Sequence, residues 1–151
     1  MASRTYWLET LGCPKNEVDS EKLATTLAAD GYVLAADPSE ADLVVVNTCA
    51  FIESAREESI ETVLELSGAR KAGAEVVVTG CMAERYGDEL ASALPEVDRI
   101  APFGASLTGT ATPVSLSGPK GEAFDLLELP RSPVDKPWAY VKVAEGCDRR
   151  C

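Results

Sequence analysis

The stretch Asp42-Leu-Val-Val-Val-Asn47 is a continuous apolar run, which is typical of a strand buried on both faces of a sheet. A second such run covers residues 75–79, and the sequence between the two runs has the length and apolar spacing of a helix. Buried strands that alternate with helices form βαβ units, in which successive strands lie parallel. The two runs therefore predict an α/β fold built on a parallel sheet.

The rest of the first hundred residues continues this alternation. Residues 5–10 and 99–101 complete four predicted strands. Helices are predicted over residues 17–30, from shortly after Cys49 to about residue 72, and over residues 82–94. We therefore expect a parallel sheet of about four to five strands flanked by helices.

The ends and buried faces of the helices can also be predicted. Asn16 is placed to cap the first helix and Gly31 to end it, while Ser54 and Glu57 have capping-box spacing for the second helix, which Gly73 would end. The apolar positions expected to face the core are Val18, Leu23, Ala24 and Leu27 in the first helix and Ile52, Ala55, Ile60, Val63 and Leu64 in the second.

The composition is that of one soluble globular domain, with 151 residues, 46% of them hydrophobic and 26% charged. The longest unbroken apolar run, residues 32–36, is far shorter than the ~20 residues that a membrane helix needs. The first twelve residues lack the apolar stretch of an export signal. A cytoplasmic protein with reduced thiols and no membrane contact is expected.

The charge is unevenly spread. Residues 1–101 hold 8 Lys and Arg against 19 Asp and Glu, and the formal net charge of the chain is −11. An acidic surface repels phosphate backbones, so we expect no direct nucleic-acid binding, whereas a basic protein partner is tolerated. The helix face formed by Glu53, Glu57, Glu58, Glu61 and Glu65 is expected to be solvated.

The amino-acid composition changes after the first hundred residues. Six of the nine prolines fall between residues 102 and 137, and a last strand is predicted over residues 138–144. We therefore expect a first domain at residues 1–102, a Pro- and Gly-rich linker at residues 103–137, and the start of a further domain at residues 138–151.

Three cysteines occupy the same structural position. Cys13, Cys49 and Cys81 each follow a predicted strand and precede a predicted helix. The carboxyl ends of parallel strands meet at one edge of the sheet, where helix N-termini stabilise anionic sulfur. Because the chain has no histidine, the candidate ligands are thiolates. Three of them suit either an iron–sulfur cluster with one iron left unligated by protein or a zinc site with an open position.

Further candidates lie next to these cysteines and near the end of the sequence. Lys15 and Asn16 are candidates for contact with a sulfur species or substrate, although a loop lysine and a helix cap would explain them equally well. Cys147 and Cys151 form a C-x3-C pair after the last predicted strand, a spacing that suits half of a metal site but also arises by chance. A complete site needs more ligands than the chain provides, which indicates that the chain is a fragment of a longer protein.

The cysteine motifs resemble those that open the radical-SAM methylthiotransferases. The three stretches are Leu11-Gly-Cys-Pro-Lys-Asn-Glu-Val-Asp-Ser-Glu21, Asn47-Thr-Cys-Ala-Phe-Ile52 and Thr79-Gly-Cys-Met-Ala83. The Cys-Pro-Lys-Asn and Cys-Ala-Phe-Ile forms resemble the branch that modifies a ribosomal protein more than the branch that modifies adenosine in tRNA. The match spans essentially residues 5–151, in order and in spacing.

The resemblance implies two clusters. Cys13, Cys49 and Cys81 would hold an auxiliary 4Fe-4S cluster whose free iron carries the sulfur to be transferred. Cys147 and Cys151 would match the first two cysteines of the radical-SAM C-x3-C-x2-C motif, after the first strand of a truncated radical-SAM barrel. The third cysteine of that motif would stand at position 154, beyond the end of this chain.

The resemblance also implies a reaction. In this branch a methylthio group is attached to the β-carbon of an aspartate in small-subunit ribosomal protein S-twelve. One S-adenosylmethionine supplies the methyl group and another supplies the radical that abstracts hydrogen. This chain alone, expected as a monomer, would bind the auxiliary cluster and would not generate the radical.

Two other functions remain open on the sequence. The first is the same enzyme class acting on tRNA, against which the acidic balance and the Pro14-Lys15 pair weigh. The second is a non-catalytic binding module, in which the three thiolates hold structural zinc and the acidic surface docks a basic partner. The metal that the thiols bind distinguishes this module from both enzymes.

Overall fold

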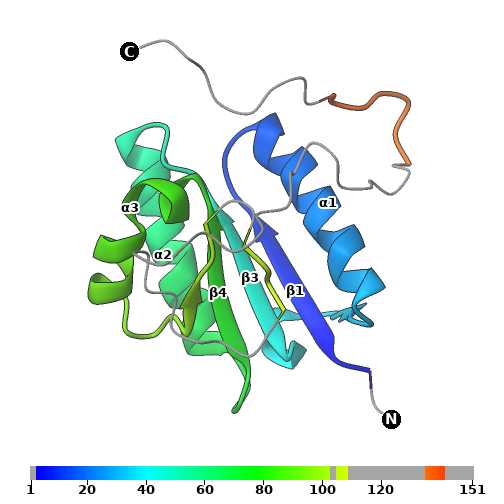
Figure 1. The fold of residues 1–151 in the computed structure, drawn as a ribbon, viewed down its shortest axis with the longest axis horizontal. Coiled ribbons are helices and arrows are strands. Elements are labelled where there is room, and N and C mark those ends of the chain that lie inside the picture. The colour runs from blue at the N-terminus through cyan, green and yellow to red at the C-terminus, as the bar shows by residue number, and fades with distance from the viewer. Residues whose placement is uncertain (1–2, 103–104, 109–134, 142–151) are drawn as a thin grey trace.

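The computed structural model describes residues 3–102, 105–108 and 135–141, and within them five parallel strands form one sheet (Figure 1). The strands are β1 (Thr5–Thr10), β2 (Val33–Leu34), β3 (Leu43–Thr48), β4 (Glu75–Gly80) and β5 (Arg99–Ile100). The helices are α1 (Pro14–Ala29), α2 (Glu53–Ala69) and α3 (Cys81–Ala93), with a short 3-10 helix, η1 (Pro38–Glu40). The expected α/β fold with a parallel sheet flanked by helices is confirmed.

The order in which strands are added to the sheet changes side between β1 and β3. The order across the sheet is β2-β1-β3-β4-β5, so the chain moves from β1 to one side and then crosses back to build the other side. In doubly wound sheets of this kind the loops on either side of such a reversal diverge, and ligands bind there at the carboxyl ends of the strands. The loops after β1 and β3 flank this point.

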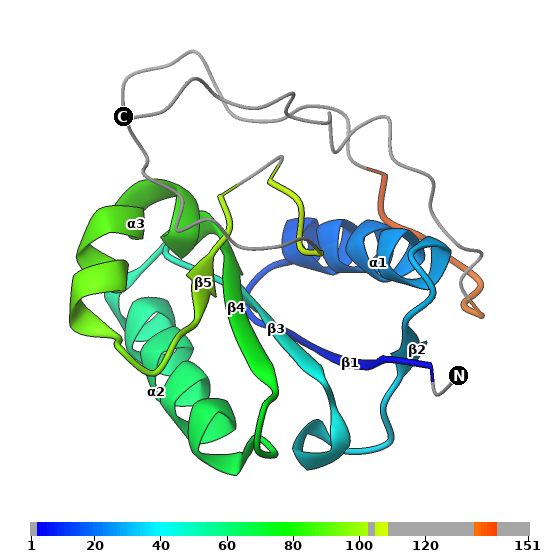
Figure 2. The same cartoon turned by 60° about the horizontal axis from the view of Figure 1, so that its bottom comes forward.

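The two faces of the sheet are covered by different helices. Helix α1 lies on one face, and α2 and α3 lie on the other (Figure 2). Alternate valines of β3 and β4 point to opposite faces, as the strand period requires. Val45 and Val77 pack in the cluster that includes Leu23 and Leu27 of α1, whereas the second cluster joins Val44, Val46, Val76 and Val78 to Val63, Leu66, Met82 and Leu90. Burial on both faces explains the continuous apolar runs.

Helix α1 begins earlier than the sequence predicted. It starts at Pro14 with Cys13 as the N-cap residue, so the expected cap at Asn16 is wrong. Proline is favoured in the first helical turn because its fixed φ suits the helix and it has no N–H group to satisfy. Gly31, at φ +87°, follows the helix as expected.

Helix α2 differs from the prediction at both ends and in the face that it buries. Ile52 is the N-cap residue with no side-chain cap, and the helix ends at Ala69, so the Ser54–Glu57 capping box and the end at Gly73 are wrong. Val63 is buried as expected, but Ile52 and Leu64 are exposed and Leu66 takes the core position. The buried face follows the helical period through residues 59, 63, 66 and 67, and the face formed by Glu53, Glu57, Glu58, Glu61 and Glu65 is exposed as expected.

The remaining differences concern short or unpaired segments. Strand β2 was not predicted, because two residues are too few to show a period. Residues 138–141 of the predicted last strand form no strand, since no described strand lies beside them to share backbone hydrogen bonds. The rest of that strand and nearly all of the predicted linker lie outside the described residues. Across the described ranges, no helix has the length and apolarity needed to cross a lipid bilayer.

Asp42 joins three segments at the amino edge of the sheet. Its carboxylate accepts a hydrogen bond from the Thr5 N–H at 2.8 Å and pairs with Lys71 Nζ at 2.6 Å. The hydrogen bond from Lys71, followed by that from the Thr5 amide, lowers the pKa of Asp42 to about 2. The carboxylate therefore ties β1 and the α2–β4 turn to the start of β3 when it is ionised.

We expect Asp42→Asn to destabilise the chain by about 1 kcal/mol at pH 7, a modest loss because the side chain is partly exposed to solvent. A carboxylate with a lowered folded-state pKa contributes fully above its unfolded pKa of about 3.9, and the contribution is lost as the pH falls toward the folded value. The difference between variant and wild type in the free energy of unfolding, measured with urea, should therefore become smaller as the pH falls from 5 to 3. Glu57→Gln, on the exposed face of α2, controls for the change in net charge. A difference that is constant with pH would contradict this role of Asp42.

Candidate functional site

The structure places Cys13, Cys49 and Cys81 within three residues of the ends of three neighbouring strands. Cys13 is the N-cap residue of α1, Cys49 follows β3, and Cys81 is the first residue of α3, directly after β4. Strands β1, β3 and β4 are adjacent and in register, and the N-terminal ends of the three helices lie at the same end of the sheet (Figure 1). The three cysteines therefore share the carboxyl edge of the sheet.

The three thiols differ in exposure. Cys13 is exposed, Cys81 is half-buried and Cys49 is buried, and all three are free of disulfide bonds. Gly12 lies directly against Cys49: a Cβ atom at Gly12 would come within 2.7 Å of the Cys49 Sγ, and its φ is +92°. Glycine is required here because it alone permits both this conformation and the close approach. The loop after β1 thus covers the thiol that follows β3.

Electrostatic interactions link the three thiols. Burial raises the pKa of the Cys81 thiol, the nearby Lys15 ammonium lowers it, and the thiols of Cys49 and Cys13 raise it further. The other two thiols therefore disfavour ionisation of Cys81. Since metal coordination deprotonates thiols outright, a bound metal cation would relieve this repulsion.

Residues on three elements fix the backbone beside the cysteines. The Ser59 hydroxyl of α2 accepts a hydrogen bond from the Cys49 N–H at 3.1 Å and donates one to the Cys49 carbonyl at 3.0 Å. Thr48 Oγ1 donates to the Thr79 carbonyl at 2.6 Å. Sequence reasoning missed Ser59, since a serine within a helix carries no signal that its hydroxyl serves a distant loop.

Lys15 and Asn16 both lie near the thiols. Lys15 is 3.6 Å from the carboxylate of Asp19, one helical turn further along α1, and Asp19 is almost fully buried. Asn16 is fully buried, and its side chain donates hydrogen bonds to backbone carbonyls of two loops. Sequence reasoning selected both residues, but it gave Asn16 the wrong structural position at the helix cap.

Three cysteine thiols are the type of ligand that a thiolate-bound metal group requires. The close approach of Gly12 to Cys49 brings two of the cysteine loops into contact. Among the described residues, however, no three cysteine or carboxylate side chains stand close enough together to hold a metal ion as they are placed. Cys49 lies under Gly12 and the Cys81 thiol faces Asn16. Cys147 and Cys151 lie outside the described residues.

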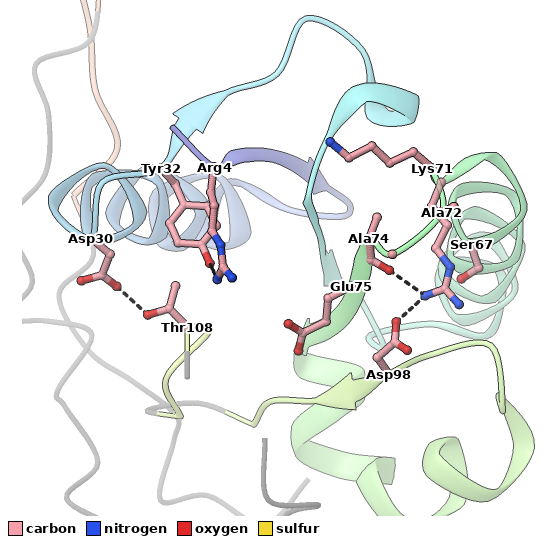
Figure 3. Close-up of a pocket in the computed structure, with 12 residues that line it drawn as sticks. Arg4, Asp30, Tyr32, Ser67, Lys71, Ala72, Ala74, Glu75, Asp98 and Thr108 are labelled. Carbon is pink, nitrogen blue, oxygen red and sulfur yellow. Dashed lines mark hydrogen bonds and ion pairs between the residues drawn. The ribbon is translucent and has the colours of Figure 1, made fainter. Parts of the chain in front are cut away.

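A second concave region lies at the opposite end of the sheet. This open groove of about 1220 Å³ is lined by residues at the amino edge, including Arg4, Tyr32, Lys71, Glu75 and Asp98 (Figure 3). Arg70 and Asp98 of the lining pair with one another. Lys71 and Glu75 of the lining pair with Asp42 and Arg99, which lie outside it. In open parallel sheets ligands bind at the carboxyl edge instead, so we place the candidate site at the cysteines.

Comparison with known proteins adds independent information. Residues 5–102 match the family model described as "Uncharacterized protein family UPF0004". A protein named "Ribosomal protein uS12 methylthiotransferase RimO" from Anaeromyxobacter sp. (strain K) is 45% identical over 100% of this chain and 34% of its own length. The protein of the same name from Myxococcus xanthus (strain DK1622) is 41% identical, over 98% of this chain and 33% of its own length.

The chain therefore spans about a third of the length of the curated relatives that it matches. Another such relative, from Carboxydothermus hydrogenoformans, is 41% identical over 97% of this chain and 35% of its own length. These names confirm the resemblance to methylthiotransferases that the three cysteine motifs indicated.

The contact between β3 and β4 can be tested with two glycines. Gly31 and Gly80 both have φ near +90°, but a Cβ at Gly31 meets nothing within 4 Å, whereas one at Gly80 would lie 2.6 Å from the Thr48 carbonyl oxygen. We expect Gly31→Ala to cost roughly 1–2 kcal/mol for the backbone conformation alone. Gly80→Ala should cost roughly 1–3 kcal/mol more, because the backbone of Thr48 cannot move away without breaking the sheet. If urea unfolding shows that the two variants lose the same free energy of unfolding, the close approach of Gly80 to Thr48 is unimportant for stability.

Proposed function

The chain belongs to the protein family whose sequence model matches residues 5–102. From that premise we propose that it is the cluster-bearing N-terminal portion of a methylthiotransferase that modifies a ribosomal protein. The observation that carries the proposal is the placement of Cys13, Cys49 and Cys81 at the ends of three adjacent strands. Three thiolates at the ligand-binding edge of the sheet are the donor set that an iron–sulfur cluster with one open iron requires.

In this proposal Cys13, Cys49 and Cys81 hold the auxiliary 4Fe-4S cluster, which when bound supplies an iron open to the sulfur that is transferred. The chain's own residues prepare the site. Burial of Cys49 beneath Gly12 keeps water from one side of the site. The Lys15 ammonium, beside Asp19, adds positive charge near the thiols and favours anionic sulfur.

The second cluster and S-adenosylmethionine belong to the whole enzyme. We assign Cys147 and Cys151 to the radical-SAM cluster from their C-x3-C spacing and the family resemblance. The radical step would need the third cysteine of that motif as well as these two. The same division places residues 1–102 in the cluster-binding domain, residues 103–137 in a linker and residues 138–151 in the radical-SAM domain.

The substrate that we propose is an aspartate of ribosomal protein uS12. The relatives' names support this choice, since they give uS12 as the protein modified by those enzymes. The excess of acidic residues in the first hundred residues also favours a basic protein partner over the phosphate backbone of tRNA. Reduced thiols and a ribosomal substrate both fit a reaction in the cytoplasm.

Metal content tests the site directly. We expect the anaerobically reconstituted chain to contain about four irons and about four sulfides, and the Cys13→Ala, Cys49→Ala, Cys81→Ala triple variant to lose them. The matched control is the Cys147→Ala, Cys151→Ala double variant, which should keep its iron. Zinc in the wild-type chain would support a structural binding module instead, and iron that depends on Cys147 and Cys151 would contradict the assignment of the ligands.

The substrate is tested in cells that lack the full-length gene. Mass spectrometry should show loss of the methylthio group from uS12, while methylthiolated adenosine in tRNA stays unchanged. Complementation with the full-length gene, and with a version carrying Cys49→Ala, separates loss of the cluster ligand from loss of the whole protein. Loss of the modification from tRNA alone would establish the alternative substrate.

A further inference from the structure

Asn16 is a fully buried polar residue next to the three cysteine loops. Its side chain is 0% exposed, although it lies in the first turn of α1, next to the exposed Cys13 and Pro14. A buried carboxamide costs free energy unless its donors and acceptor find partners. Its partners therefore indicate what Asn16 does.

The Asn16 amide group bridges two of the cysteine loops. Its Nδ2 donates to the Leu11 carbonyl at 2.8 Å and to the Thr48 carbonyl at 3.0 Å. Leu11 and Thr48 stand directly before Gly12-Cys13 and Cys49, so each carbonyl belongs to the turn that orients a cysteine. One side-chain nitrogen thus joins a partly buried carbonyl in the loop after β1 to a buried carbonyl at the end of β3.

The third loop meets Asn16 through the other atom of the carboxamide. The Cys81 Sγ donates to Asn16 Oδ1 at 3.9 Å, a long contact of the kind that sulfur makes. The Thr48 carbonyl that Asn16 holds is also the group that a Cβ at Gly80 would approach to 2.6 Å. The turns after β1, β3 and β4 therefore converge on one side chain.

Residues of β1, β3 and α1 hold Asn16 itself in place. Asn47 Nδ2 donates to the Asn16 carbonyl at 3.1 Å and to Ser20 Oγ at 3.0 Å. Thr10 Oγ1 donates to the same Ser20 hydroxyl at 2.6 Å. The bond from Asn47 holds the backbone of Asn16, and the bonds to Ser20 tie the next turn of α1 to β1 and β3. The backbone from which the carboxamide extends is therefore fixed relative to both strands.

We propose that Asn16 is a positioning residue that locks the Cys13, Cys49 and Cys81 loops to one another through its carboxamide. The proposal deepens the proposed function, because it names what sets the spacing of the three ligands. Asn16 does not coordinate the metal in this account. It keeps the backbones of the three loops together before any metal binds, so that only the cysteine side chains have to move to reach a common metal group.

The test uses the chain without metal and measures alkylation of each cysteine by iodoacetamide under native conditions, quantified by peptide mass spectrometry. Opening of a loop speeds the reaction of a buried thiol such as Cys49 and of a half-buried one such as Cys81. Asn16→Asp is nearly isosteric, but it replaces the Nδ2 donor with a carboxylate oxygen, which cannot donate to the Leu11 and Thr48 carbonyls. We expect it to raise the labelling rates of Cys49 and Cys81 by about tenfold or more, since two hydrogen bonds to buried groups are lost. Labelling of the exposed Cys13 should stay unchanged and serves as the internal reference.

Two control variants separate this role from a general loss of stability. Ser67→Ala removes a buried hydroxyl near the opposite end of the sheet and should leave all three rates unchanged. Ser59→Ala removes hydrogen bonds to the Cys49 backbone and should raise labelling at Cys49 but not at Cys81. If Asn16→Asp does not fold, Asn16→Gln, which keeps the amide but displaces it by one methylene, is measured in its place.

The proposal is overturned if the Asn16 variant labels like Ser67→Ala, or if it affects Cys49 alone as Ser59→Ala does. A second measurement uses the reconstituted chain: release of iron to a chelator should be about tenfold faster in the Asn16 variant than in Ser67→Ala. A wild-type chain that takes up no iron would refute the proposed function, while the labelling pattern would still decide the role of Asn16.

Discussion

Strands β3 and β4 have no face in contact with water, because Val44–Val46 and Val76–Val78 are fully buried. Such a pair needs helices on both faces. Because the strands are parallel, the chain must also cross back over the sheet after each strand, so that every strand starts at the same edge. The register then pairs Thr48 with Gly80 and Thr10 with Asn47, so β1, β3 and β4 end level with one another. The common position of the three cysteines follows from this burial.

Burial also determines what the carboxyl edge must contain. Backbone groups that leave the strands there are screened from water, and each unsatisfied one would cost free energy. Asn16, Asn47 and Ser59 supply the missing partners, and they do so with side chains from α1, β3 and α2. Glycines at positions 12 and 80 let the loops approach closely enough for these bonds to form. The loops are thus positioned by hydrogen bonds as well as by apolar packing.

The sequence predicted the parts of this structure that depend on burial over several residues. The runs in β1, β3 and β4 placed these strands to within a residue, and with them the positions of the three cysteines. It failed where one residue type serves two purposes. An asparagine is common at a helix cap, so the sequence predicted a cap at Asn16, and nothing local shows that one of its partners is Thr48 at the end of β3. The buried face of α2 was misjudged because Leu64 and Leu66 are equally apolar and only the packing of α2 on the sheet distinguishes them.

The three cysteine motifs consist mostly of residues that shape the loops. In Leu11-Gly-Cys-Pro-Lys-Asn16, Gly12 allows contact with Cys49, Pro14 begins α1, and Asn16 bonds to two backbone carbonyls. In Thr79-Gly-Cys81, the Thr79 carbonyl accepts from Thr48, and Gly80 permits the close approach to β3. Each of these two motifs contains one thiol and several residues that fix its backbone. The motifs therefore determine the backbone geometry of the loops as well as supplying the ligands.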